Sequence, residues 1–165
     1  MSSALNTAIY RRLAGVETLS GKWLGYQQTL GSILGVDTDT SLPNVYHGNM
    51  NDAPAVKDAD GILMPLITFR PSGGTADHRF AHGSAVDDGI YDIEIWSWYG
   101  TANTVTDIFA AMARLIDRRY GCPAPVLDSG ECAWIDPLVG LNVLYDDQRN
   151  GWFGLSRWNV IEVSE

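Results

Sequence analysis

The sequence predicts an α+β fold, in which amphipathic helices pack on a sheet. Two patterns between Asp88 and Gly121 predict this fold class. From residue 91 to residue 95 apolar and acidic side chains alternate, which is typical of a strand with one buried face. From residue 105 to residue 116 the apolar side chains recur at the i, i+3, i+4, i+7 spacing of a helix. They are Val105, Ile108, Phe109, Met112, Leu115 and Ile116.

The ends of this helix are predicted by residue type. Thr104, followed three positions later by Asp107, is suited to cap the N-terminus, where the dipole favours an acidic group. Arg118 and Arg119 suit the C-terminus, and Gly121 can adopt the left-handed conformation that closes a helix. Burying one apolar side chain contributes about 1.5–3 kcal/mol, whereas ordering each backbone residue costs about 1–2 kcal/mol. The helix therefore needs a sheet to pack on.

The N-terminal part of the chain predicts a second helix and a short strand. Residues 3–13 have an apolar edge at helical spacing, and we expect this helix to pack on the same sheet. Residues 16–44 mix glycines with aromatic and aliphatic side chains, which predicts an irregular or short-helical excursion that is partly covered. Residues 44–48 predict a short strand, and residues 49–61 a polar loop.

The middle of the chain predicts a strand followed by a long connection. The strand covers residues 62–70, with Pro65 near its beginning or on an edge because proline cannot donate to a ladder. Residues 71–88 are rich in Gly, Ser and charge, so we expect a long mobile loop between two strands. Long loops in compact domains are often functional.

The C-terminal part predicts the remaining strands. Residues 124–127 and 131–135 can form one interrupted strand. Residues 139–145 and 152–163 predict two more, joined by a turn that contains the hairpin signal Asn150-Gly151.

Composition limits the possible function classes. With 165 residues, 1–165 is most simply a single domain. The formal net charge of −9 opposes broad affinity for nucleic acid or for an anionic membrane. No apolar run approaches the length of a membrane span, and the first residues lack the order of a secretion signal, so we expect the protein in a cytoplasm. In that compartment Cys122 and Cys132 are expected to be reduced structural thiols.

The residue pairs that could do chemistry all have simpler interpretations. His78 and His82 have the i, i+4 spacing of helical metal ligands, but they lie among glycines without a third ligand. The aspartate pairs at 87–88 and 146–147 could suggest paired acids, yet adjacent carboxylates on a strand point to opposite faces, and those at turns are usually solvated. Ser72 lacks a nucleophile-elbow motif and is expected in a turn. We therefore predict no catalytic, cofactor-binding or metal-binding residue.

The tryptophans are the remaining candidates for a functional site. Alternation places Trp96 and Trp98 on the face opposite Tyr91, Ile93 and Ile95, so at least one should leave the principal core. A subunit interface is a natural destination, because aromatic residues concentrate there. The alternative is a small-molecule-binding or hydrolytic domain whose tryptophans line a pocket.

The order of the motifs carries a family resemblance that covers nearly the whole chain. The motifs are NVYHG at 44–48, PLITFR at 65–70, DHRF at 77–80, YDIEIWS at 91–97, TDIFAAMARLID at 106–117 and WNVIEV at 158–163. In this order the chain resembles the tail-terminator, or tail-completion, proteins of long-tailed bacteriophages and gene-transfer agents. It departs from the family in the Gly-rich excursion and around CPAPVLDSGECAW.

The resemblance implies an α+β fold with two helices on one face of a mixed, mostly antiparallel sheet. It also implies a hexameric ring at the head-proximal end of the virion tail, assembled in the host cytoplasm. Such a ring caps the tail tube protein, stops its polymerisation and contacts the head-tail connector or neck protein. It implies no catalytic residue and no cofactor, and DNA passes through the ring without specific binding. A head-closure or neck adaptor is the alternative within the virion.

Ring closure requires one patch to meet a different patch on the next copy. We expect Asp77, His78 and Arg79 to lie in that contact, because they belong to the long connection after residue 70. Trp96 or Trp98 is expected to supply the apolar anchor.

Overall fold

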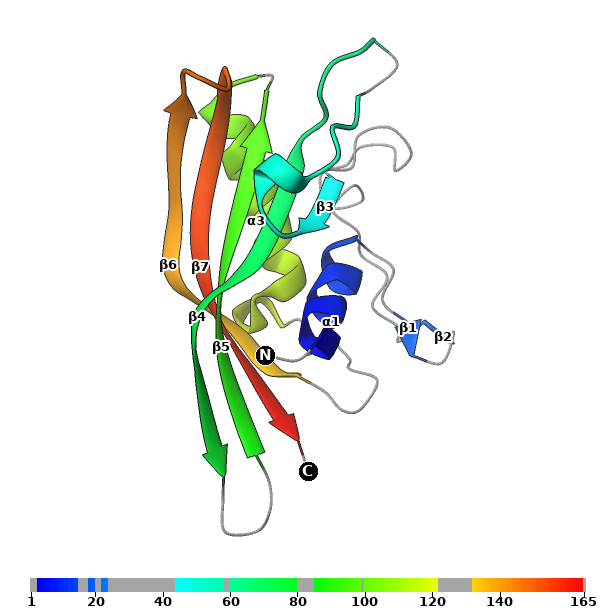
Figure 1. Ribbon diagram of the computed structural model, residues 1–165, viewed down its shortest axis with the longest axis vertical. Helices are drawn as coiled ribbons and strands as arrows, with labels where there is room; N and C mark the ends of the chain where they lie inside the picture. The colour runs from blue at the N-terminus through cyan, green and yellow to red at the C-terminus, as the bar shows by residue number, and fades with distance from the viewer. Residues whose placement is uncertain are drawn as a thin grey trace.

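A five-stranded sheet forms the framework of the protein (Figure 1). In spatial order its strands are β3 (Asn44–His47), β4 (Leu66–Arg79), β5 (Ala85–Ser97), β7 (Gly151–Ser164) and β6 (Cys132–Asp146). β3 runs parallel to β4, and the other three pairings are antiparallel. The mixed, mostly antiparallel sheet is therefore confirmed.

The computed structural model describes residues 3–14, 18–19, 22–23, 44–57, 60–79, 85–98, 100–121 and 132–164. Besides the sheet these form the helices α1 (Ser3–Ala14) and α3 (Ala102–Ile116) and the 3-10 turns η1 (Met50–Asp52) and η2 (Arg118–Tyr120). The short strands β1 (Thr18–Leu19) and β2 (Lys22–Trp23) pair with each other. The expectations for residues 24–43 and 124–127, Cys122 and His82 lie outside the described residues.

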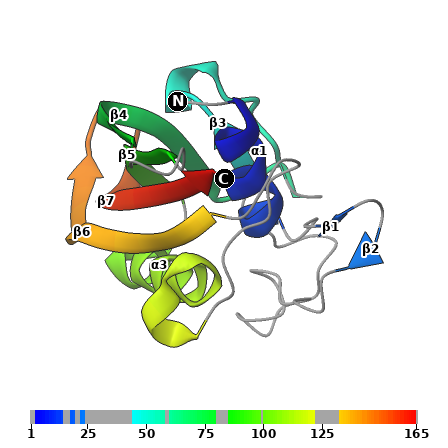
Figure 2. The same ribbon diagram turned by 90° about the horizontal axis from the view of Figure 1, so that it is seen from below.

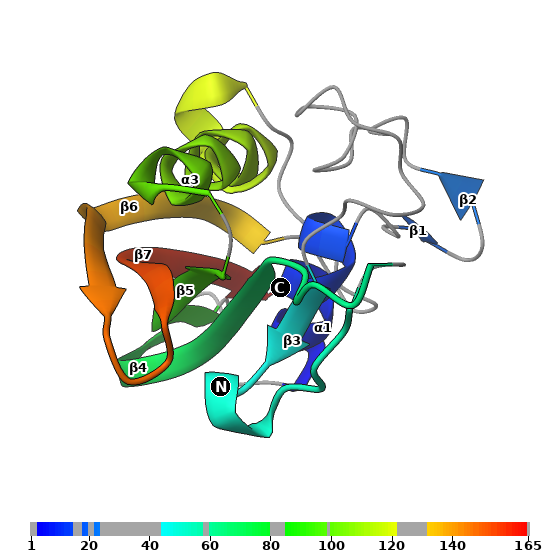
Figure 3. The same ribbon diagram turned by 90° about the horizontal axis from the view of Figure 1, so that it is seen from above.

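Both helices pack on the same face of the sheet, as predicted (Figures 2 and 3). The core between them uses the alternation of β5: Tyr91, Ile93 and Ile95 are almost completely buried. Trp158 of β7, directly opposite Tyr91, is buried with them. The apolar stripes of the helices fill the rest of the core, with Leu5, Ala8, Ile9, Leu13, Val105, Ile108, Met112, Leu115 and Ile116.

The start of α3 differs from the prediction. Thr101, not Thr104, is the N-cap, and its hydroxyl accepts a hydrogen bond from the backbone N–H of Asn103. The backbone N–H of Thr101 in turn donates to Thr104 Oγ1 at 3.4 Å. Because this reciprocal capping box satisfies two backbone groups, the helix starts earlier than a cap at Thr104 would allow.

The end of α3 is fixed by Asp117 rather than by the two arginines that follow it. Asp117 is almost completely buried, and Arg118 and Arg119 lie in η2 instead of the last helical turn. Asp117 Oδ1 accepts the backbone N–H of Arg119 at 2.9 Å, and the Arg119 guanidinium reaches Asp117 Oδ2 at 2.6 Å. Gly121 has the predicted left-handed conformation, with φ 76°, at the end of η2.

The largest difference from the prediction is the segment 71–88, which we expected to be a loop. Instead, β4 continues to Arg79 and β5 begins at Ala85, so Ser72 lies in a strand rather than in a turn. Two register shifts between Pro71 and Ala76 accommodate the proline and the glycines within the pairing of β4 with β5. β7 pairs with the other side of β5 as far as Ala85, so the extension is a three-stranded ribbon.

We call residues 71–79, 85–90 and 159–164 the ribbon. It projects beyond the two helices at the lower end of Figure 1. At the other end of the sheet, β6 and β7 form the predicted hairpin, whose turn includes Asn150 at φ 52°. β6 is one strand with register shifts, not the interrupted strand that we expected before residue 139.

The Asp117 carboxylate gives the first prediction. Burial opposes its charged form, but the side-chain and backbone hydrogen bonds of Arg119 outweigh burial and hold the pKa of Asp117 below its usual value. We expect Asp117→Asn to lower the free energy of unfolding near pH 7 by about 1 kcal/mol, because bonds to a charged acceptor are lost.

Because its pKa is lowered in the folded state, Asp117 stabilises the fold above about pH 4, and this contribution is lost as the pH falls through the folded-state pKa. Urea denaturation at about pH 7 and about pH 3 measures the difference from wild type, which should shrink at the lower pH. Asp107→Asn, at an exposed position of α3, is the matched control. If Asp117→Asn lowers the free energy of unfolding equally at both pH values, the ionised carboxylate of Asp117 is not the source of the stabilisation.

Candidate functional site

The described part of the chain contains no cluster of metal-ligating side chains and no helix suited to cross a membrane. Within it, no three His, Cys, Asp or Glu side chains form a group that could hold a metal ion. Neither described helix has both the length and the apolar character of a membrane span. The candidate site is a surface of the sheet on which aromatic and charged side chains gather.

That surface is the face of the sheet opposite the helices, which we call the open face. Strand pairing and alternation assign its residues, since neighbours in register share a face. Asp92 faces Arg70 and Arg157, Glu94 faces Leu155, and Trp96 faces Phe153. On β6 the residues in register with this face are Val139, Asn142 and Leu144.

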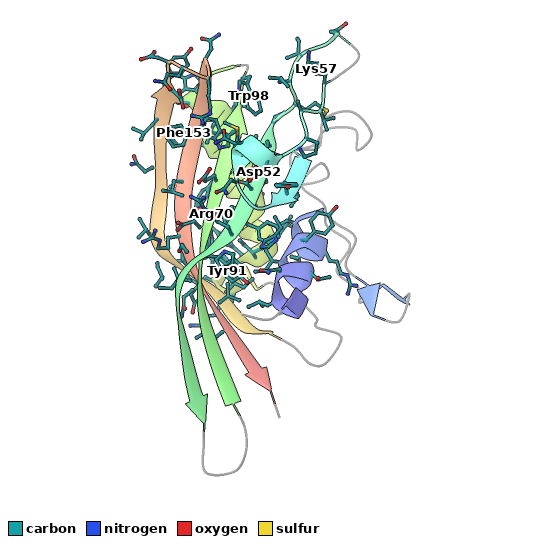
Figure 4. All side chains as sticks on the ribbon, viewed as in Figure 1. Asp52, Lys57, Arg70, Tyr91, Trp98 and Phe153 are labelled. Atoms are coloured by element: carbon teal, nitrogen blue, oxygen red, sulfur yellow. The ribbon has the colours of Figure 1, made fainter. Side chains whose placement is uncertain are left out.

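An aromatic cluster lies at one end of the open face. Trp96 is only 5% exposed and stacks on Phe153, with 4.7 Å between ring centroids. Trp98 also stacks with Trp96, with 6.3 Å between ring centroids. The guanidinium of Arg149, from the β6–β7 turn, lies 5.5 Å from the Trp96 ring. Figure 4 shows Trp98 and Phe153 at the same end of the sheet. Trp96 is therefore mainly structural, because little of its surface remains to be buried.

Two ion pairs follow along the open face. Arg157 binds Asp92 through two hydrogen bonds of 2.7 and 3.2 Å, and Arg70 binds Glu94 at 3.2 Å. In each pair the guanidinium is more exposed than the carboxylate, 46% against 9% and 43% against 20%. The hydrogen bond to Asp92 raises the pKa of Arg157. In both pairs the guanidinium is thus the outer group and the carboxylate the more buried one.

The β6–β7 turn repeats this arrangement. Asp146 accepts the backbone N–H groups of Gln148 and Arg149, and it pairs with the Arg149 guanidinium at 2.8 Å. The backbone and side-chain hydrogen bonds of Arg149 lower the pKa of Asp146. Here too the guanidinium is the more exposed partner. Asp146, the last residue of β6, thus holds the turn in place through these hydrogen bonds.

The arginines also close the hollow between η1 and the sheet. This open hollow has a volume of about 380 Å³ and includes Asn49, Arg70 and Arg149 in its lining. Arg70 donates to Asn49 Oδ1, and Arg149 donates to Asn51 Oδ1 at 3.0 Å. Because protein acceptors already bind both guanidinium groups, the hollow is a contact between η1 and the sheet. It adds no argument for a small-molecule site.

Between these charges lies an apolar patch, which we define as Val139, Leu144, Phe153 and Leu155. Val139 and Leu144 are 55% and 49% exposed, and Leu155 is also exposed. Leu144 lies directly opposite Phe153, and Val139 directly opposite Arg157. The patch therefore joins the aromatic cluster to the arginines. This patch was not predicted from the sequence, although the alternation of side chains around residues 152–158 is a usable signal for it.

The residues predicted for the site lie at two ends of the sheet. Asp77, His78 and Arg79 are paired with residues 85–87 near the end of the ribbon, whereas Trp96 and Trp98 lie beside η1. At about 3.3 Å per residue, Ala85 and Trp96 are roughly 35 Å apart along β5. The structure does not bring the two groups together within one copy.

Comparison with known proteins gives a fold relationship. Models of protein families and curated protein sequences gave no match to this chain. Among solved structures, a chain of the virion of a native gene transfer agent particle matches with a TM-score of 0.60 and 14% sequence identity. The match covers 98% of this chain and 96% of that chain. At this identity, the two chains share a fold over nearly their whole lengths.

The aromatic cluster gives the second prediction. We expect Phe153→Ala to lower the free energy of unfolding by about 2 kcal/mol, because it removes the ring that stacks on Trp96. Leu144→Ala, at the exposed position directly opposite, should cost less than about 1 kcal/mol. Urea denaturation followed by tryptophan fluorescence measures both variants. Equal losses would mean that the cluster does not stabilise the fold.

Proposed function

We propose that this chain is a structural virion protein, the tail terminator that caps the tail tube and stops its polymerisation. One observation supports this function most strongly: the fold matches a chain of a gene transfer agent virion over nearly the full length of both chains. The order of helix, strands and helix is the order in which the quoted motifs occur. The role is structural and requires no catalytic group and no cofactor.

In this proposal six copies form a closed ring at the head-proximal end of the tail. One side of the ring binds the tail tube protein, and the other offers a surface to the head-tail connector or neck protein. The acidic chain lets DNA pass through the ring without specific binding, because like charges repel. Assembly takes place in the host cytoplasm.

The shape of the chain supports a contact between unlike surfaces. The projecting ribbon is one surface, and Asp77, His78 and Arg79 belong to it. The open face is the second, and its aromatic cluster lies at the other end of the sheet, with Trp96 largely buried and the half-buried Trp98 as the proposed anchor. Because the two surfaces differ and lie far apart, each copy can contact one neighbour at each end.

Electron microscopy of particles assembled without this chain tests the function. We expect overlong or uncapped tubes beside DNA-filled heads that lack tails. A head-closure or neck adaptor would instead leave tubes of normal length that fail to join heads. Normal, joined particles would contradict both roles.

Salt should control the association of copies. A ring of six copies multiplies the net charge of −9 sixfold, and this self-repulsion is screened beyond about 8 Å at physiological ionic strength. We expect a monomer at very low salt and association at about 0.15 M salt, on a tube end or with divalent cations. Sedimentation velocity across a salt series measures this, and a stable ring at very low salt would contradict it.

A further inference from the structure

We infer that the open face of the sheet is the docking surface for the ribbon of a second copy of this chain. The inference names the two surfaces that meet in the proposed ring. It rests on the proposed function in one respect, namely that successive contacts close into a ring. The docking itself is argued from three features: the apolar patch, the exposed arginines and the charges of the ribbon.

The apolar patch has the composition of an interface centre. Val139 and Leu144 expose about half of their surface, and Phe153 beside them is backed by the buried ring of Trp96. No described element covers these side chains, because α1 and α3 both pack on the other face (Figures 2 and 3). Protein interfaces typically place apolar and aromatic side chains at the centre and polar groups, with arginine enriched, around them.

The arginines around the patch select an acidic partner. Arg70, Arg149 and Arg157 each expose more of the side chain than the carboxylate that pairs with it. The open face therefore presents positive groups on a chain whose net charge is −9. Each of these arginines is already paired with a carboxylate of its own chain, but the guanidinium is the outer member of every pair. An acidic segment of a second copy that approaches this face therefore meets guanidinium groups first.

The ribbon has the complementary charge. Asp77 lies directly opposite Asp87, and Asp87 lies directly opposite Glu162, so three acidic residues occupy one row across the three strands. Over its whole length the ribbon has four acidic residues and one arginine. This acidic composition is complementary to the exposed guanidinium groups of the open face.

The ribbon cannot fold back onto its own open face, because β4, β5 and β7 run continuously through both. Phe153 and Glu162 lie on the same strand, and at about 3.3 Å per residue they are roughly 30 Å apart. The contact must therefore join two copies through unlike surfaces. A contact of this kind, repeated with a rotation that closes, generates a ring.

The first experiment measures self-association by sedimentation velocity at about 0.15 M salt over a wide range of protein concentration. The face variant combines Leu144→Glu with Leu155→Glu, and we expect its association to be at least about tenfold weaker than that of wild type. The matched control is Tyr120→Glu in η2, since Tyr120 is also an exposed large side chain. Circular dichroism checks folding, and Val139→Glu alone replaces the face variant if the double substitution unfolds.

The second experiment separates the two surfaces. The ribbon variant combines Asp77→Asn with Glu162→Gln, which leaves the open face intact. Each variant alone should associate weakly. A mixture of the two should form one-to-one dimers and nothing larger, because only one intact ribbon and one intact face can meet.

Several results would overturn the inference. If the face variant associates as strongly as wild type, the apolar patch is not part of the contact between copies. If the mixture forms no dimers, the ribbon does not dock on the open face. A chain that stays monomeric but needs the patch to bind tube ends would assign the open face to the tube protein instead. A different result would contradict the proposed function: particles assembled without this chain that still form normal tails.

Discussion

The alternation of side chains along β5 determines which residues of the sheet form the core and which form the open face. β5 is paired on both sides, so its pleat fixes the face on which β4 and β7 place their own residues. Tyr91, Ile93 and Ile95 point to the helices and form the core. Asp92 and Trp96 necessarily lie on the other face. A shift of one residue would expose the core and bury the charges, so core packing and the open face are determined together.

The same constraint explains why an acidic chain has a face on which arginines are exposed. The carboxylates on β5 start from a central strand and are shielded by their neighbours, whereas the paired guanidinium groups on β4 and β7 extend outward. The net charge of the chain therefore does not describe this face. An assembly built from copies of one acidic protein needs such a surface, because long-range repulsion acts everywhere else.

Much of the fold could be predicted from the sequence, because periodicity identifies strands and helices that have one buried face. The stripe of α3 and the alternation from Tyr91 to Ile95 are strong signals and were correct. The cap at Thr101 was missed because two threonines are three positions apart, and only the reciprocal bond distinguishes them. The ribbon was missed because its stability comes from pairing with β7, which lies far away in the sequence, while its glycines and Pro71 locally favour a loop. The apolar patch could not be predicted without the strand order, because only the pairing of β6 with β7 brings Leu144 beside Phe153.

A cryo-electron microscopy reconstruction of the head-proximal end of the tail in complete particles would show directly how the copies meet. We predict a single ring of six copies above the tube, in which the ribbon of each copy lies on the open face of the next. Copies distributed along the tube, or a ring in which the open face contacts only other proteins, would contradict it.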